Sequence, residues 1–274
     1  MDLKLNEKVA IVTGGAKGIG RAIVNCLVAE NAKVVFADLD STASENLVVD
    51  LVEMFGDAIR DNVSFIIGDL SDESNCQQIV DRTVEQFGKI DILINNAGFN
   101  DSTGFCCSEA TFLESLQKNL VQVFSVTKFA SNELKKNEGS IVNVSSKVSV
   151  TGQGGTTGYA AAKGAVNALT REWAVELADW NVNVNTVLPA ECWTASYAKW
   201  IESQSNPEAA KKEIGDLVPL GKRFTNAEEI ADAVVFLASP RSSHTTGQLL
   251  FVDGGYTHLD RKLSAKMNIH WTGN

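Results

Sequence analysis

Short apolar runs alternate with amphipathic helical patterns along almost the whole of this 274-residue chain. The apolar runs occupy residues 8–13, 33–38, 63–69, 90–98, 139–146, 182–189 and 248–255. Runs of this length predict strands buried on both faces, and such strands are typical of parallel sheets. Their alternation with helices predicts an α/β fold, a single doubly wound domain over 1–274 with about seven parallel strands and helices on both faces.

Helices are expected in the segments between these strands, because apolar residues recur there at helical spacing. The predicted helices end at Glu30 after the first strand and then cover 41–59, 72–88, 108–136, 157–179 and 226–238. Two further segments stand apart from the sheet. A polar helical excursion at 191–216 is predicted to cap the substrate, and a polar tail occupies 260–274.

Composition removes several classes of function. The formal net charge of −10 argues against a nucleic-acid partner, and no apolar run approaches the roughly 18 residues needed to span a membrane. The N-terminus lacks the features of a secretory signal, so a cytoplasmic location is expected. The five cysteines match no CxxC pattern and the three histidines form no metal-like group, so neither a disulfide framework nor a metal site is expected.

A glycine-rich loop, TGGAKGIG at 13–20, follows the first predicted strand and precedes a helix. Glycines at 14, 18 and 20 allow a tight turn and a close approach of the backbone to a pyrophosphate at the helix N-terminus. Asp38 lies 18 residues beyond Gly20, at the end of the second strand, where a carboxylate accepts hydrogen bonds from ribose hydroxyls. Asp38 would also repel a 2′-phosphate, which favours NAD over NADP, although Lys17 in the loop points weakly the other way.

The segments TGGAKGIG (13–20), NNAG (95–98) and YAAAK (159–163), together with Asn119 and Ser146, resemble the short-chain dehydrogenase/reductase family. The joint spacing carries the resemblance, because Ser146 precedes Tyr159 by 13 residues and Lys163 follows it by four. The resemblance covers nearly the whole chain and implies a Rossmann-type fold, an NAD cofactor and a homotetramer.

Tyr159 and Lys163 share one helical face, since residues four apart lie one turn from each other. A free tyrosine has a pKa of about 10, and a nearby cation lowers that pKa toward the range of a general base. Tyr159 is therefore expected to remove the proton of a substrate hydroxyl. The resemblance implies that Ser146 holds the substrate oxygen, that Lys163 also reaches the nicotinamide ribose, and that Asn119 supports a proton-carrying water.

The family's cofactor contacts transfer to matching positions of this chain. The resemblance implies that they are made by Gly14, Lys17, Gly18, Ile19, Gly20, Asp38, Asp69, Leu70, Asn95, Ala97, Gly98, Tyr159, Lys163, Pro189 and Thr194. Ala190 follows Pro189 where the family usually has glycine, a departure that affects the local loop geometry.

Residues 140–261 resemble most closely the branch of the family that contains bacterial L-fucose dehydrogenases, which oxidise the anomeric carbon of a free aldose. The implied substrate is a small sugar. Polar side chains near the expected pocket suit a polyol better than a steroid or acyl chain, because each unpaired desolvated hydroxyl costs about 1–3 kcal/mol. The expected substrate contacts are Asn100, Asp101, Ser146, Gln153, Tyr159, Glu191, Trp193 and Trp200.

Other interpretations stay open. Trp193, Tyr197 and Trp200 either stack on a sugar or form a small core of the excursion. The same chemistry could act on another secondary alcohol or ketone (a hydroxysteroid, a 3-oxoacyl group or a polyol), with NADP(H). A nucleotide-binding regulatory protein would usually lack part of the Asn–Ser–Tyr–Lys set, and an interaction module has no specific sequence support.

Overall fold

The computed structural model describes residues 2–258, so the predicted tail at 260–274 lies outside the described residues. One seven-stranded parallel sheet has the order β3-β2-β1-β4-β5-β6-β7. Its strands are β1 (Val9–Thr13), β2 (Lys33–Asp38), β3 (Val63–Ile67), β4 (Ile92–Asn95), β5 (Ser140–Val144), β6 (Asn183–Pro189) and β7 (Leu249–Val252). The predicted single-domain, doubly wound α/β fold is confirmed.

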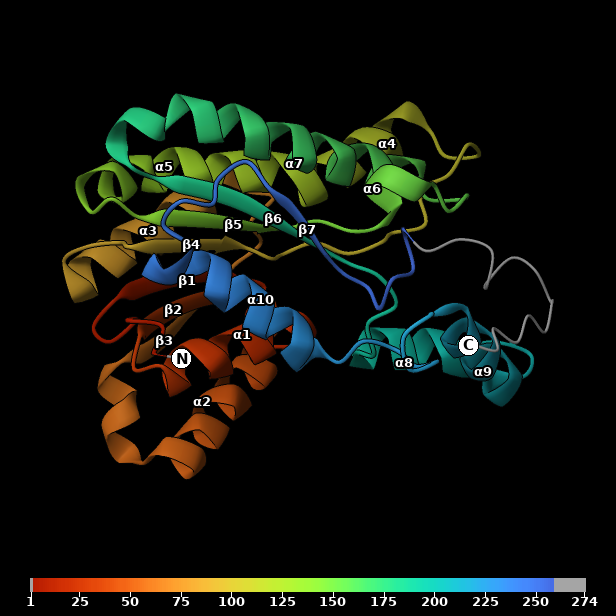
Figure 1. Ribbon diagram of the computed structural model, residues 1–274, viewed down its shortest axis with the longest axis horizontal. Helices are drawn as coiled ribbons and strands as arrows, with labels where there is room; N and C mark the ends of the chain where they lie inside the picture. Colours follow the sequence, from red (N-terminus) through yellow and green to blue (C-terminus); the bar gives the residue numbers. More distant parts are fainter. Residues whose placement is uncertain (1, 259–274) are drawn as a thin grey trace, which may run out of the picture.

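Helices cover both faces of the sheet, with α1, α2 and α10 on one side and α3, α5 and α7 on the other (Figure 1). The helices are α1 (Gly18–Ala29), α2 (Ser41–Phe55), α3 (Glu73–Phe87), α4 (Glu109–Leu116), α5 (Gln122–Lys136), α6 (Val148–Thr151), α7 (Thr157–Glu176), α8 (Ala195–Glu202), α9 (Pro207–Leu217) and α10 (Ala227–Ala238). Shorter 3₁₀ turns are η1 (Asp57–Asp61), η3 (Ala178–Trp180) and η4 (Pro240–Ser242), and η2 (Gln117–Val121) is a π-helical turn.

The strands separate two hydrophobic cores, as expected where both faces of a sheet are covered. Side chains such as Leu27 of α1 and Val234 of α10 fill one core. Ile79 of α3, Val126 of α5 and Val166 of α7 fill the other. These cores hold the sheet rigidly between the helix layers, and the excursion with α8 and α9 extends past one end of the sheet (Figure 1).

Two helices differ from the sequence prediction. The helix expected over 108–136 is divided into α4, η2 and α5, so one wider turn interrupts it at Asn119. The helix expected over 41–59 ends at Phe55, because Gly56 takes a φ of +90° that leaves the helical region. The chain then re-enters a short 3₁₀ turn, η1.

The parallel register aligns the carboxyl ends of the strands. Val12 of β1 pairs with Phe36 of β2 on one side and with Ile94 of β4 on the other. The strand order therefore reverses direction beside β1, and ligands of doubly wound folds bind in the crevice at such a point. The predicted site residues lie on the loops that leave this edge of the sheet, at the ends of the strands, and on the helices that follow, such as Asn119 on η2 and Tyr159 and Lys163 on α7.

Candidate active site

The glycine-rich loop after β1 is built so that only glycine fits at its key positions. Gly14 and Gly18 have φ of +63° and +52°, a region that side chains disfavour. A Cβ on Gly20 would lie 1.9 Å from the Gly14 carbonyl oxygen. The Asn96 amide donates to the carbonyls of Thr13 and Gly14, both at 2.9 Å, and holds the turn against β4. The loop is thus a cradle that leaves its space to a ligand.

This cradle opens onto the N-terminus of α1, and Lys17 makes no side-chain hydrogen bond to cap that end of the helix. Unsatisfied N–H groups at a helix start attract phosphate groups. A Cβ on Gly18 would lie 3.2 Å from the Thr194 methyl group, so the predicted nicotinamide segment approaches the same cradle. The Ile19 side chain packs against the hydrophobic core that includes Leu27 and Val234.

Asp38 ends β2 beside the loop, as predicted. One of its carboxylate oxygens accepts from the Ala16 N–H at 3.0 Å and the other from the Asp40 N–H at 3.1 Å. Lys17 forms an ion pair with Asp40. A hydrogen bond from Lys17, followed by one from the Ala43 N–H, holds the pKa of Asp40 below its usual value. The loop cation that would favour a 2′-phosphate therefore already has an anionic partner.

The remaining predicted cofactor residues line the same edge of the sheet. Leu70 is buried, and the Asp69 carboxylate accepts from the Ser71 N–H at 2.9 Å. Asn95 donates to Asn143 of β5 at 2.9 Å and so joins two central strands. The Ala97 N–H donates to the Thr13 hydroxyl at 3.0 Å.

The four predicted catalytic residues lie at the carboxyl ends of β4 and β5. Lys163 is buried, donates to the Val144 carbonyl at 2.8 Å, and places its ammonium 5.7 Å from the centre of the Tyr159 ring. Ser146 follows β5, and its hydroxyl lies close enough to the Tyr159 phenol to lower the pKa of that phenol. A Cβ on Gly98 would lie 2.9 Å from the Asn119 oxygen and 3.2 Å from the Lys163 ammonium, so glycine there lets these two side chains meet.

Asn119 lies on the π-helical turn η2 and is fully buried. Its side-chain oxygen accepts from the Phe99 N–H at 2.9 Å, and its amide donates to the Ser115 carbonyl at 3.1 Å. π-Helical turns often occur at functional sites, because they turn a side chain away from the regular helical path. Here the turn directs Asn119 toward the loop that follows β4.

Burial governs the protonation of the Tyr–Lys pair. Burial raises the pKa of Tyr159 to about 12. The nearby Ser146 hydroxyl acts to lower this pKa, and the Asp101 charge adds to the rise. Burial alone lowers the pKa of Lys163 to about 8. The expected lowering of the Tyr159 pKa by Lys163 is therefore wrong for the protein by itself. The ammonium bonds the Val144 carbonyl, and both buried groups favour their neutral forms.

The polar loop after β4 reaches the start of α7. The Thr103 carbonyl accepts from the Gly158 N–H at 3.1 Å, next to Tyr159. Asp101 is close enough to Tyr159 for its charge to act on the phenol. Asn100 accepts from the Ser102 N–H at 3.1 Å, and Gln153 is exposed. Of these three predicted substrate residues, Asp101 is the one whose charge acts on the predicted catalytic tyrosine.

The Glu191 side chain contacts two other side chains of the protein. Its buried carboxylate forms an ion pair with Lys147 and accepts a hydrogen bond from the Tyr197 hydroxyl. No local sequence signal could have found this contact, since Lys147 and Glu191 are 44 residues apart.

The aromatic residues of the excursion pack on one another. The rings of Trp193 and Phe224 are 5.0 Å apart, and those of Tyr197 and Trp200 are 5.4 Å apart. This arrangement favours the alternative in which the aromatic residues form a small core of the excursion.

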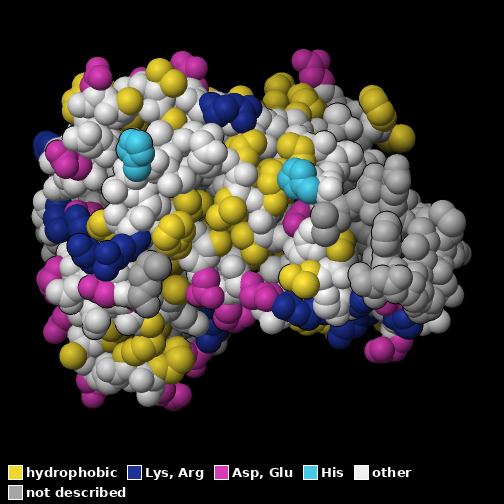
Figure 2. Space-filling view, in the orientation of Figure 1, with side chains coloured by type: hydrophobic (Ala, Val, Ile, Leu, Met, Phe, Trp, Pro, Cys, Tyr) yellow, Lys and Arg dark blue, Asp and Glu magenta, His cyan; other side chains and the backbone are white. Residues whose placement is uncertain are grey.

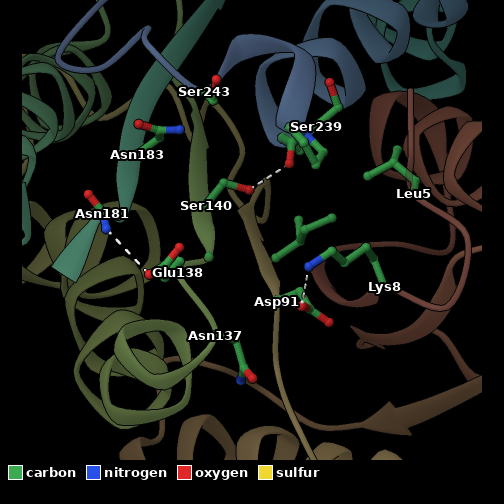
Figure 3. Close-up of a pocket in the computed structure, with 14 residues that line it drawn as sticks. Leu5, Lys8, Asp91, Asn137, Glu138, Ser140, Asn181, Asn183, Ser239 and Ser243 are labelled. Atoms are coloured by element: carbon green, nitrogen blue, oxygen red, sulfur yellow. Dashed lines mark hydrogen bonds and ion pairs between the residues drawn. The ribbon is translucent and has the colours of Figure 1, made fainter. Parts of the chain in front are cut away.

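A separate polar cavity of about 420 Å³ opens at the amino ends of β1, β4, β5 and β6 (Figure 3). The predicted active site lies at the opposite edge of the sheet, at the carboxyl ends of the strands. Its buried carboxylate, Asp91, accepts from Lys8 at 2.7 Å and from the Val9 N–H at 2.9 Å, and pairs with Lys89 at 2.9 Å. Burial acts to raise the pKa of Asp91, but these partners outweigh it and hold the pKa low. The carboxylate is bound by three protein groups and joins the starts of β1 and β4 at this edge of the sheet, so we assign it a structural role.

Within residues 2–258, no group of three or more His, Cys, Asp or Glu side chains could hold a metal ion. No helix among the described residues is long and apolar enough to cross a membrane.

The parallel sheet, the glycine cradle and the Asn–Ser–Tyr–Lys set define a class of protein, the dinucleotide-dependent oxidoreductases. A family model described as Enoyl-(Acyl carrier protein) reductase matches residues 14–257. The chain belongs to the short-chain dehydrogenase/reductase family.

Known relatives cover almost the full chain. The L-fucose dehydrogenase of Rattus norvegicus is 35% identical over 92% of this chain and 90% of its own length. The 3-oxoacyl-[acyl-carrier-protein] reductase FabG of Thermotoga maritima is also 35% identical, over 92% of this chain and 99% of its own. The crystal structure of Cj0485 dehydrogenase matches with a TM-score of 0.90 and 40% identity, over 95% of this chain and 98% of that one.

Proposed function

We propose that this protein oxidises the C1 hydroxyl of a free aldose, such as L-fucose, to the 1,5-lactone with NAD. The observation that carries the proposal is the polar loop after β4: its Thr103 carbonyl accepts from the Gly158 N–H at 3.1 Å, next to Tyr159, and the charge of its Asp101 acts on the Tyr159 phenol. Burial acts to raise the pKa of Asp101, but the nearby Ser115 and Thr103 hydroxyls, with the Thr103 N–H that donates to the carboxylate at 3.3 Å, outweigh it and hold the pKa low. An ionised carboxylate at this place suits a ligand with several hydroxyl donors, whereas an acyl chain or steroid would desolvate it without compensation.

Each residue of the site has its own role in the proposed reaction. When bound, the oxidised nicotinamide supplies the hydride acceptor and a positive charge. Tyr159 takes the proton of the C1 hydroxyl as C1 loses its hydride and becomes the lactone carbonyl carbon, while Ser146 holds the oxygen by hydrogen bonding. With the cofactor bound, the charge of Lys163, fixed at the Val144 carbonyl, would add to that of the nicotinamide in stabilising the phenolate. Asn119, held on η2, supports the water through which the proton leaves.

The proposed preference for NAD rests on two carboxylates. Asp38 stands at the end of β2, where a 2′-phosphate would meet its charge directly. Asp40 adds a second negative charge nearby and pairs with Lys17. Both features oppose NADP.

A second candidate function keeps the chemistry and changes the substrate. The similarity to a 3-oxoacyl-[acyl-carrier-protein] reductase favours reduction of a ketone, for which the alternative cofactor is NADPH. That reaction needs an apolar channel for an acyl chain and a cation for the 2′-phosphate. The charge of Asp101 beside Tyr159 and the Lys17–Asp40 pair speak against both.

The test is nicotinamide reduction by the purified protein with NAD or NADP, across L-fucose, D-arabinose, L-galactose, D-glucose and a secondary alcohol. We expect NAD-dependent turnover of L-fucose and its stereochemical relatives, and its loss in Tyr159→Phe. Turnover of the alcohol alone would refute the sugar substrate and keep the mechanism. Activity that survives in Tyr159→Phe would show that another group is the base.

We also propose that the protein is a homotetramer, as the family resemblance implies. Two exposed apolar faces support this. On α5 and α7, Phe124 is 48% exposed and Val175 is 79% exposed. On another face, apolar side chains gather over α10 and β7 (Figure 2), where Phe236 and Leu250 are partly exposed. A closed tetramer of two-fold symmetry needs two separate self-complementary interfaces, and these two apolar faces are our candidates for them.

A further inference from the structure

A buried ion pair lies next to the catalytic serine. Lys147 and Glu191 are 8% and 9% exposed, and their side chains are paired. The Tyr197 hydroxyl donates to the second oxygen of Glu191. The Lys147 ammonium also lies 3.8 Å from the centre of the Tyr256 ring. We call Lys147, Glu191 and Tyr197 the latch.

The latch joins segments that are distant in the sequence. Lys147 directly follows Ser146, its N–H donates to the Pro189 carbonyl at 2.9 Å, and its own carbonyl accepts from the N–H groups that close α6. Glu191 lies just after β6, and its carbonyl accepts from the Thr225 N–H at 2.8 Å. Tyr197 belongs to the first turn of α8. The latch therefore connects the catalytic loop after β5 with the excursion.

The same helix also faces the cofactor cradle. The Thr194 hydroxyl caps α8 by accepting from the Tyr197 N–H at 3.2 Å, and the Thr194 methyl group lies against Gly18. Moving α8 would thus alter the space between the cradle and Ser146. That space is where a substrate has to lie.

Energetics favour a positioning role for the latch. The free energy lost when two charges are removed from water offsets much of the attraction between them. Well-packed apolar residues at the same place often give the protein equal stability. We therefore explain this ion pair by its geometry: it holds two segments of the chain in one fixed arrangement. Each carboxylate oxygen of Glu191 accepts from one protein donor, which fixes the orientation of the carboxylate between the two segments.

We propose that Glu191 is a positioning residue which, through Lys147 and Tyr197, fixes the α8–α9 excursion against the Ser146 loop and so sets the affinity for substrate. The kinetic consequence rests on the proposed dehydrogenase function. The structural consequence is that α8 and α9 are held against the Ser146 loop, and this consequence does not depend on the proposed function.

The variant that isolates the latch is Tyr197→Phe. It removes one hydroxyl and keeps the ring, which packs 5.1 Å from Phe224. Tyr256→Phe is the matched control, because it also removes one phenol hydroxyl and keeps the ring beneath Lys147. Glu191→Gln keeps the side-chain size and one acceptor but removes the charge. Lys147→Met removes the other partner of the ion pair.

Two measurements follow for each variant: the rate of trypsin cleavage after Lys199, Lys211 and Lys212, which lie on α8 and α9, and the kinetics with L-fucose at saturating NAD. For Tyr197→Phe we expect cleavage and KM each to rise about 10-fold, since a buried acceptor loses its donor, while kcat falls less than about 3-fold. The melting temperature of Tyr197→Phe should stay near that of the wild type, because the sheet and its two cores do not change. Glu191→Gln should also raise KM. The control should remain within about 2-fold of the wild type in both measurements.

Unchanged cleavage and KM in both Tyr197→Phe and Lys147→Met would overturn the latch. So would equal changes in the Tyr256→Phe control, or a fall in kcat and melting temperature with an unchanged KM. If no variant and no wild-type protein oxidises an aldose, the proposed function fails, and the cleavage rates still decide whether the latch holds the excursion.

Discussion

Replacing the buried Lys163 with methionine should stabilise the protein while abolishing catalysis. Lys163 is 2% exposed and has no carboxylate partner among the described residues; its ammonium bonds the Val144 carbonyl. Burial lowers its pKa from the ordinary value of 10.5 to about 8. At about 1.4 kcal/mol for each pH unit, the buried charge costs about 3 kcal/mol of folding stability near neutral pH.

The sign of the pH dependence follows from proton binding. Between about pH 8 and pH 10 the unfolded chain keeps the Lys163 proton and the folded protein releases it, so this group makes the wild type more stable as the pH rises. The gain over that range is about 2 kcal/mol. Tyr159 acts oppositely above about pH 10, because burial raises its pKa to about 12. Burial also raises the pKa of Cys26, Cys76 and Cys192, so these thiols act oppositely between pH 8 and pH 10. Their contributions cancel in the difference between Lys163→Met and the wild type, and it is this difference that isolates Lys163.

The assay is urea unfolding followed by tryptophan fluorescence, at one fixed protein concentration and without cofactor. At neutral pH, Lys163→Met should be more stable than the wild type by about 2 kcal/mol, after allowance of about 1 kcal/mol for the lost hydrogen bond. The difference should close by about 2 kcal/mol between pH 8 and pH 10. A less stable variant at neutral pH, or a difference that does not change with pH, would refute the argument that Lys163 is a buried charge.

Three further predictions test the cradle, the cofactor preference and the assembly. Gly20→Ala should weaken NADH binding at least about 10-fold in a fluorescence titration, because its Cβ would meet the Gly14 carbonyl, whereas Gly164→Ala in α7 should add about 0.5–1 kcal/mol of stability and leave binding unchanged. Asp38→Ser with Asp40→Ser should improve kcat/KM for NADP at least about 10-fold by freeing Lys17, and an unchanged NAD/NADP ratio would contradict that. Val175→Asp should reduce the mass measured by light scattering, and an intact tetramer in this variant would exclude α7 from the interface.

The fold followed from local patterns, because strands buried on both faces leave short apolar runs that the sequence displays directly. The catalytic set was equally visible, since Tyr159 and Lys163 are one helical turn apart. What the sequence could not display depends on packing between distant segments. The turn η2 places Asn119 against the Phe99 N–H, and the Lys147–Glu191 pair joins residues from two loops. The balance of burial and charge at Tyr159 likewise needed the three-dimensional environment.

The most direct measurement of the central claim uses L-fucose carrying deuterium at C1. The protein, NAD and this sugar are incubated, and the reduced cofactor and the sugar product are analysed by mass spectrometry. The proposed reaction predicts deuterium in the reduced cofactor and an unlabelled lactone or its aldonate, both absent with Tyr159→Phe. Reduced cofactor without deuterium, or deuterium retained in an oxidised sugar, would contradict oxidation at C1.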